Sequence, residues 1–274
     1  MKNTLPSDYN FILPYSPETL FRLGIDKDGG YIIDRKIFEK TNILLSFGMA
    51  DEYSFEIDFL NKDKKNKVYI FDYSINHTFY IKEIFKNLRR IFKFKRRYEN
   101  LKHILKIYSN FRKFINKNRV MFFSKKVTNR IKSSEDIKVS EIFKKINLES
   151  DDEITLKIDI EGDEYNIIDD VLLYQKNIAQ IVMEYHDTHQ RKDLFFDNVK
   201  KIQKFYSVVH IHGNNYRKFN NDGFPINIEI TFCKKKYINK TCKKSYSFPI
   251  SKLDFPNNPE FPDLKIQFQK EKVI

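Results

Sequence analysis

The sequence has no tryptophan, only two cysteines and no long apolar run. Cys233 and Cys242 are too few for a disulfide scaffold or for a zinc site with four cysteine ligands, and they suit a reducing compartment. No stretch of about 18 apolar residues occurs, so we expect no transmembrane helix. The first eight residues lack the apolar segment of a signal peptide. These absences together predict a cytoplasmic location.

A chain of 274 residues is long enough to bury one core, and we interpret residues 1–274 as a single domain. Within it we distinguish an N-terminal cap (1–40), a basic helical insertion (81–118) and a C-terminal tail (245–274). Residues 17–23 are expected to begin a short helix with Ser16 as its cap. The tail holds four prolines, and we expect it to cross the surface without regular structure.

The net charge of +13 is concentrated in one segment. Residues 81–133 hold 18 Lys and Arg but only two acids, whereas the rest of the chain holds 32 basic and 35 acidic residues. Apolar residues recur in this segment at spacings of three and four, which predicts two amphipathic helices on either side of residues 96–100. Their basic faces are open to three interpretations: a solvated surface enriched in lysine by genome composition, contact with anionic lipid at the inner face of a membrane, or contact with nucleic acid or a phosphate-bearing acceptor.

Apolar runs elsewhere predict the strands of an α/β sheet. The runs at 42–47, 67–71 and 154–160 each lead into a glycine or an acid. Further strands are expected at 120–124, 178–185, 206–211 and 226–232, the last two as an antiparallel hairpin that closes the sheet. Helices are expected at 52–60, 138–147, 165–174 and 193–205.

The first strand leads into a turn at Gly48 and then a helix, which is the first unit of a nucleotide-binding α/β fold. Asp72 ends the second strand, where a carboxylate can accept hydrogen bonds from both hydroxyls of a ribose. The turn has a single glycine, with Ala50 where a second would stand, so the pyrophosphate of a dinucleotide is disfavoured. The pattern favours S-adenosylmethionine, a nucleoside cofactor without phosphates, over NAD.

Several short motifs occur in order along most of the chain. They are Asp28-Gly29-Gly30-Tyr31, Ser46-Phe47-Gly48 with Asp51 and Ser54-Phe55-Glu56, Phe71-Asp72, and residues 156–164, 182–186 and 209–216. Together they resemble the FkbM family of S-adenosylmethionine-dependent methyltransferases. The resemblance implies a class I methyltransferase fold, in which helices cover both faces of a Rossmann-like, mostly parallel sheet. It also implies O-methylation of a sugar or related hydroxyl.

Methyl transfer from a sulfonium requires alignment and, for a hydroxyl acceptor, removal of a proton. A histidine is favoured as the proton acceptor because its pKa lies near neutral pH. The candidate catalytic residues are His186, Asp159 and His212. The candidate cofactor-binding residues are Ser46, Phe47, Gly48, Asp51, Glu56 and Asp72. The candidate acceptor-binding residues are Tyr31, Glu161, Glu184, Asn214 and Asn215.

Oxygen and imidazole donors for a divalent cation are also available, from Asp159, Glu184, His186 and His212. They form no compact metal motif, so direct base catalysis is the preferred hypothesis. The leading function is an O-methyltransferase that acts on a sugar hydroxyl of a surface polysaccharide, such as a capsule, or of its nucleotide- or lipid-linked precursor. Two alternatives stay open: a nucleic-acid methyltransferase that uses the basic helices, and a non-catalytic basic adaptor.

Overall fold

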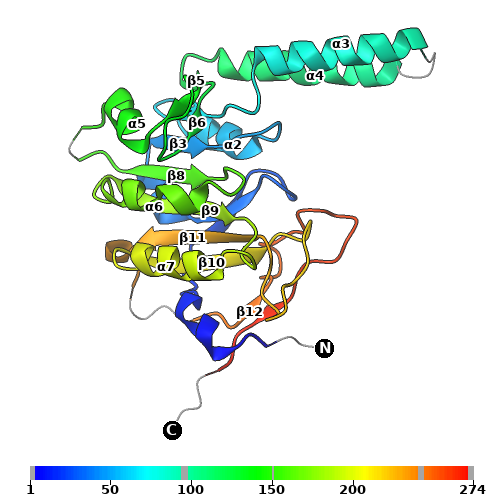
Figure 1. Ribbon diagram of the computed structural model, residues 1–274. Helices are drawn as coiled ribbons and strands as arrows, with labels where there is room; N and C mark the ends of the chain where they lie inside the picture. The colour runs from blue at the N-terminus through cyan, green and yellow to red at the C-terminus, as the bar shows by residue number, and fades with distance from the viewer. Residues whose placement is uncertain (1–3, 94–97, 150, 240–243, 271–274) are drawn as a thin grey trace.

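The computed structural model describes residues 4–93, 98–149, 151–239 and 244–270. Within these residues, a seven-stranded sheet has the order β10-β11-β9-β8-β3-β4-β5 (Figure 1). The strands are β3 (Ile43–Phe47), β4 (Lys67–Phe71), β5 (Val120–Phe123), β8 (Ile154–Ile158), β9 (Ile178–Tyr185), β10 (Tyr206–Gly213) and β11 (Ile228–Lys234). Neighbours from β5 to β9 pair in parallel, whereas β11 is antiparallel to both β9 and β10. The predicted α/β fold, with its closing antiparallel hairpin, is confirmed.

Helices cover both faces of this sheet. One face packs against α5 (Val139–Ile146), α6 (Glu164–Leu172) and α7 (Lys192–Ile202). The other packs against α1 (Arg35–Lys40), α2 (Ser54–Lys62) and the buried end of α4 (Tyr98–Ile115). The expected helices at 52–60, 138–147, 165–174 and 193–205 are therefore present, with ends shifted by one to three residues.

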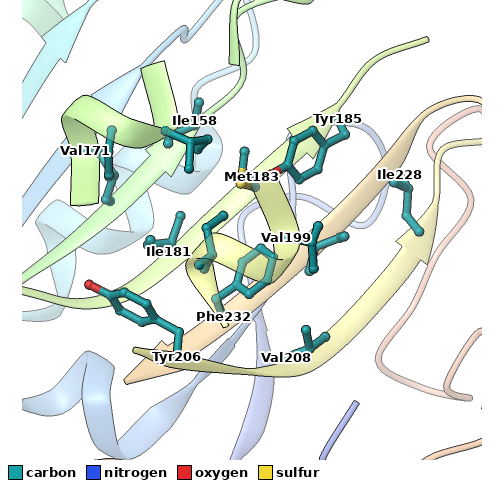
Figure 2. Close-up of a cluster of buried hydrophobic side chains, with 14 of the residues drawn as sticks. Ile158, Val171, Ile181, Met183, Tyr185, Val199, Tyr206, Val208, Ile228 and Phe232 are labelled. Atoms are coloured by element: carbon teal, nitrogen blue, oxygen red, sulfur yellow. The ribbon is translucent and has the colours of Figure 1, made fainter. Parts of the chain in front are cut away.

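The side chains of β9 show how the two faces divide. Ile181, Met183 and Tyr185 point into the hydrophobic cluster beneath α6 and α7 (Figure 2). Since side chains alternate along a strand, Val182 and Glu184 lie on the opposite face, and Val182 packs in the second cluster with α2. The buried polar residues of the central strands therefore gather on the α2 face.

A helical hairpin separates β4 from β5 in the sequence. It consists of α3 (His77–Lys93) and α4, and it projects from the body of the protein (Figure 1). These are the two amphipathic helices predicted in the basic segment, while Arg96 and Arg97 of their connection lie outside the described residues. Phe111 and Phe114 are buried and anchor the end of α4. Over the ranges given above, none of the helices combines the length and apolar character needed to span a bilayer.

The N-terminal cap differs from the prediction. Residues 20–23 form not a helix but a strand, β1 (Leu20–Leu23), which pairs antiparallel with β2 (Tyr31–Asp34). The pairing satisfies the backbone of both segments while Leu20 and Leu23 are buried, so tertiary packing outweighs the local helix signals. The remaining short elements are η1 (Ser7–Ile12), β6 (Lys126–Val127), β7 (Asp136–Ile137), η2 (Lys235–Tyr237), β12 (Ser247–Phe248) and β13 (Ile266–Gln267). Except for β12 and β13, the described part of the tail is irregular, as predicted.

Candidate functional site

The carboxyl ends of β3, β4, β8 and β9 meet at one edge of the sheet, where ligands bind in open α/β folds. The last paired residues are Phe47 with Phe71, Phe47 with Ile158, and Ile158 with Met183. One position beyond these pairs stand Gly48, Asp72, Asp159 and Glu184. The strand register therefore brings together residues that lie more than a hundred positions apart in the chain.

The turn after β3 depends on glycine. Gly48 has a φ of 79°, in the left-handed region that favours glycine. A Cβ atom at this position would lie 1.7 Å from the carbonyl oxygen of Asp159, so the two strand ends approach too closely for any side chain. Ala50 also has a positive φ, of 52°. The backbone of this turn is thus fixed against the end of β8.

Asp72 lies next to the Gly48 turn, as predicted, and holds it in place. Its Oδ2 atom accepts hydrogen bonds from the backbone N–H groups of Met49 at 2.7 Å and Ala50 at 2.8 Å. Its Oδ1 atom accepts from the backbone N–H of Ser74 at 2.7 Å and from the Ser74 hydroxyl at 2.6 Å. A carboxylate offers about four acceptor positions. A ribose diol would therefore have to share Asp72 with the backbone that it organises.

Ser46, Phe47 and Glu56, three of the predicted cofactor-binding residues, are fully buried and lie beneath the turn. Glu56 Oε1 accepts a hydrogen bond from Ser46 Oγ at 2.7 Å and forms an ion pair with Lys157 Nζ at 3.1 Å. Lys157 Nζ also donates to the carbonyl of Gly48 at 3.3 Å. The side chains of Ser46, Glu56 and Lys157 thus form a buried polar cluster that supports the Gly48 turn.

A pocket of about 160 Å³ opens at the sheet edge. It is lined by Gly48, Met49, Ala50, Phe71, Asp72, Tyr73, Ser74, Lys125, Lys126, Val127, Asp159, Ile160, Glu161 and Asp163. Ligand pockets in proteins usually have volumes of about 300 to 1,000 Å³, so this pocket would enclose only part of a nucleoside cofactor. Asp51, a predicted cofactor contact, instead lines a larger hollow of about 390 Å³ between α2 and α4, which contains none of the acids at the strand ends.

His186 lies at the end of β9 among carboxylates. Its Nδ1 atom is 3.3 Å from Glu164 Oε1, and its Nε2 atom is 3.6 to 3.8 Å from oxygens of Asp159, Glu161 and Glu184. Burial alone would lower the pKa of His186, but Glu164 and Glu184 outweigh it and raise the pKa to about 10. The carboxylates therefore favour a positive charge among them, either on the ring or on a bound cation. The role of His186 as the proton acceptor stays a prediction.

Four predicted residues beside His186 form two hydrogen-bonded pairs. Tyr31 is buried, and its hydroxyl donates to Asp159 Oδ2 at 3.0 Å. Asn214 Nδ2 donates to Glu184 Oε1 at 2.8 Å. Burial and the nearby Asp159 charge raise the pKa of Glu184 well above its usual range. Asp159 has a partly exposed side chain and lines the pocket, so it is the predicted proton acceptor that a ligand can reach.

His212 and Asn215, predicted as a catalytic and an acceptor-binding residue, are both paired with other parts of the chain. His212 is buried, with Nδ1 at 3.2 Å from Glu229 and Nε2 at 3.0 Å from Asp263, so neither ring nitrogen faces an opening. Asn215 Nδ2 donates to the carbonyl oxygens of Asn258 and Phe261. Both residues attach the C-terminal tail to the sheet.

Sequence reasoning missed Asp28, Glu164, Glu229 and Asn257 at this site. Glu229 lies directly opposite both Glu184 and His212 in the strand register, which only the sheet pairing reveals. Asn257 Nδ2 donates to Asp28 Oδ1 at 3.1 Å and to Glu229 Oε1 at 2.6 Å. Asp28 begins the Asp28-Gly29-Gly30-Tyr31 motif, and Glu164 ends the 156–164 motif, but neither is among the predicted site residues. Both are drawn to the cluster by tertiary packing.

Three of the four residues that the sequence offers as metal ligands lie together in the structure. Asp159, Glu184 and His186 each offer one donor atom, and these atoms lie within 4.8 Å of one another. Asp28, Glu184 and Glu229 form a second such group, which shares Glu184. His212 is in neither group, because Glu229 and Asp263 occupy its two nitrogens.

No protein-family model matches this chain, and no curated protein matches it. Solved structures that resemble it include the fibrillarin pre-rRNA processing protein of Methanococcus jannaschii, at 8% identity over 72% of this chain and 68% of that one, with a TM-score of 0.39. Precorrin-6y C5,15-methyltransferase of Geobacter metallireducens shares 14% identity over 78% of this chain and 97% of its own, with a TM-score of 0.35. A fibrillarin/Nop5p complex shares 12% identity over 71% and 73%, with a TM-score of 0.36. Scores this low carry no argument about activity, and the fold rests on the strand order instead.

Proposed function

We propose that this chain is an S-adenosylmethionine-dependent O-methyltransferase whose acceptor is a sugar hydroxyl of a surface polysaccharide or of its activated precursor. The observation that carries the proposal is the meeting of the Gly48 turn, Asp72 and Asp159 around one pocket at the carboxyl edge of the sheet. The sugar acceptor is proposed because the ordered motifs resemble the FkbM family.

The chemistry of the pocket suits a cationic nucleoside. Asp72, Asp159 and Glu161 contribute carboxylates that complement the ammonium and sulfonium charges of the cofactor, whereas Asp163 is paired with Lys126 at 2.7 Å. Phe71, Met49, Val127 and Ile160 contribute apolar surface for an adenine ring. The glycine turn lets the cofactor approach the backbone closely, and no phosphate-binding glycines are needed.

Transfer requires the acceptor oxygen to form a bond to the methyl carbon as the bond from carbon to sulfur breaks. The proton of the hydroxyl must then pass to the protein. Asp159 takes this proton in the proposed reaction, because it is the candidate base that lines the pocket. Glu161, whose side chain is 86% exposed, is placed at the entrance to bind acceptor hydroxyls.

Titration calorimetry with the purified chain tests the cofactor assignment. S-adenosylmethionine is expected to bind at one site, NAD is not, and Asp72→Ala is expected to weaken binding about tenfold or more. Asp197→Asn, on the exposed surface of α7, is the matched control and should bind normally. Absence of binding to the native chain would remove the proposal. The acceptor is then tested by mass spectrometry of host surface glycans, where loss of the protein should remove one CH₂ per repeat.

The α3–α4 hairpin favours an anionic membrane surface as a further partner. Ile81, Phe85 and Leu105 are exposed on it together with Lys82 and Lys86, the combination typical of helices that lie in a lipid interface. The hairpin also projects from the body, so a flat surface can reach it (Figure 1). Such contact would bring the site to a lipid-linked acceptor.

Vesicle sedimentation separates the membrane partner from nucleic acid, whose phosphates the same basic residues would suit. Arg89→Glu with Arg90→Glu should abolish binding to phosphatidylserine vesicles, whereas Lys64→Glu with Lys65→Glu, an equal charge change at an exposed loop, should not. If the chain binds RNA with a steep salt dependence and ignores vesicles, a nucleic-acid methyltransferase becomes the better assignment.

A further inference from the structure

We propose that Asp159, Glu184 and His186 form a binding site for one divalent transition-metal ion at the edge of the pocket. Each residue offers a donor atom, and the three atoms lie within 4.8 Å of one another. The three residues come from the ends of two neighbouring parallel strands, β8 and β9, so the sheet itself fixes their spacing. The site would bind its cation whether or not the chain transfers methyl groups.

The distances within the group fit an ion better than direct hydrogen bonds. His186 Nε2 lies 3.8 Å from Asp159 Oδ1 and 3.7 Å from Glu184 Oε1. Ligands at about 2.0 to 2.2 Å from a metal are separated by about 3 to 4 Å, depending on the angle between them. Among the residues with described side chains, no hydrogen bond reaches Nε2, although the His186 side chain is 90% buried and this atom lies within 3.8 Å of three carboxylates.

Each of the three ligands is held by a further polar group, which is the arrangement that orients metal ligands in proteins. Glu164 accepts from His186 Nδ1 at 3.3 Å and leaves Nε2 free to coordinate. Glu164 is itself fixed, because it accepts hydrogen bonds from the backbone N–H groups of Gly162 and His186. The Tyr31 hydroxyl binds Asp159, and the Asn214 amide binds Glu184.

The second acidic group, formed by Asp28, Glu184 and Glu229, is not a separate site. The Asn257 amide already bridges Asp28 and Glu229, and His212 Nδ1 lies 3.2 Å from the second oxygen of Glu229. Asp28 and Glu229 instead place negative charge beside the group formed by Asp159, Glu184 and His186. Buried carboxylates this close together are costly without a neutralising partner, and a cation beside Glu184 would supply one.

The donor set selects the kind of ion. Imidazole with two carboxylates suits Mn²⁺, Fe²⁺ or Zn²⁺, whereas Ca²⁺ and Mg²⁺ prefer oxygen ligands alone. The open coordination positions would face the pocket through Asp159, which lines it. In the proposed methyl transfer, and only if that function holds, the ion would lower the pKa of the acceptor hydroxyl.

Titration of Mn²⁺ alone into the EDTA-treated full chain, followed by calorimetry and by the loss of the free-ion electron paramagnetic resonance signal, tests the site. One ion should bind per chain, and Asp159→Asn and His186→Gln should each weaken binding by about tenfold or more. His103→Gln, on the exposed surface of α4, is the matched control and should bind normally. Glu229→Gln reports on the second acidic group. A larger loss of Mn²⁺ affinity in Glu229→Gln than in His186→Gln would overturn the assignment.

The native chain provides a readout that does not depend on the variants folding. Pulsed paramagnetic resonance of the bound Mn²⁺ should show coupling to one imidazole nitrogen. Absence of that coupling would exclude the site. So would a failure of binding to saturate at about millimolar Mn²⁺. Because no methyl donor is present, failure here is distinct from failure of the methyltransferase proposal.

Discussion

The ammonium group of Lys157 lies 3.1 Å from the carboxylate of Glu56, and both side chains are fully buried beneath the Gly48 turn. Burial alone would lower the pKa of Lys157, but the charges of Glu56 and Asp159 outweigh it and raise that pKa. The raised pKa keeps Lys157 charged, and its ion pair with Glu56 links β8 to α2 at the base of the pocket. Its role is to support the turn, since neither side chain reaches the surface.

Removing both members of this pair should cost less than the sum of the two single removals. Lys157→Met leaves the Glu56 charge buried without its partner, which typically costs about 3 to 5 kcal/mol of unfolding free energy. Lys157→Met combined with Glu56→Gln should cost clearly less than the sum of the two single changes. Guanidinium denaturation of the four proteins measures this cycle. Additive losses would show that the pair is not coupled.

A methyl group at Gly48 should be tolerated far less well than one at Gly162. Both glycines have a positive φ, so alanine brings about 1 to 2 kcal/mol of backbone strain at either position. At Gly48 the new Cβ would also lie 1.7 Å from a backbone oxygen, whereas at Gly162 it would meet the flexible end of Arg191 at 3.3 Å. The melting temperature of Gly48→Ala should therefore fall further than that of Gly162→Ala. Equal falls in melting temperature would mean that the close approach of the strand ends does not limit the turn.

The acceptor atoms of Asp72 should control local opening of the turn. Asp72→Asn keeps the size of the side chain but replaces one acceptor oxygen with an NH₂ group that faces N–H donors. A buried unsatisfied polar group costs about 1 to 3 kcal/mol, so the amide protons of Met49 and Ala50 should exchange with solvent about tenfold faster or more. Hydrogen exchange measures this. Asp197→Asn is the control, and unchanged exchange in Asp72→Asn would mean that other contacts hold the turn.

The sheet could be predicted from the sequence because parallel strands buried on both faces require continuous apolar runs. The segments that became β3, β4 and β8 each show such a run followed by a glycine or an acid, and the register then places Gly48, Asp72 and Asp159 together. This part of the site follows from local sequence patterns and from the rule that the carboxyl ends of parallel strands meet at one edge of the sheet. The short hairpin at 20–34 did not follow, because its pairing depends on packing against the sheet.

The protonation and pairing of the histidines could not be predicted from local patterns. His186 was expected to be a free base, but its charge is set by Glu164 and Glu184, which come from different elements. His212 is bound by Asp263, from an irregular tail 51 positions away in the sequence. No periodicity or motif reports such contacts. A candidate base is therefore identified reliably only once its neighbours in space are known.

The buried pairing of His212 predicts a specific pH dependence of stability. Burial alone would lower the pKa of His212, but Asp263 and Glu229 outweigh it and raise the pKa to about 10. The unfolded chain has a histidine pKa of about 6.5, so the folded state binds this proton more tightly. The resulting stabilisation is complete below about pH 6.5 and is lost as the pH rises towards 10.

The measurable consequence is a difference between two proteins, because other groups titrate in both. The unfolding free energy of the native chain should exceed that of His212→Gln most at about pH 6.5, and this difference should shrink steadily as the pH approaches 10. Urea denaturation at several pH values in that window provides the data. His103→Gln, which replaces an exposed histidine, should show a small difference that does not vary with pH. A constant difference for His212→Gln would mean that His212 is neutral in the folded protein, and that Glu229 and Asp263 do not hold its proton.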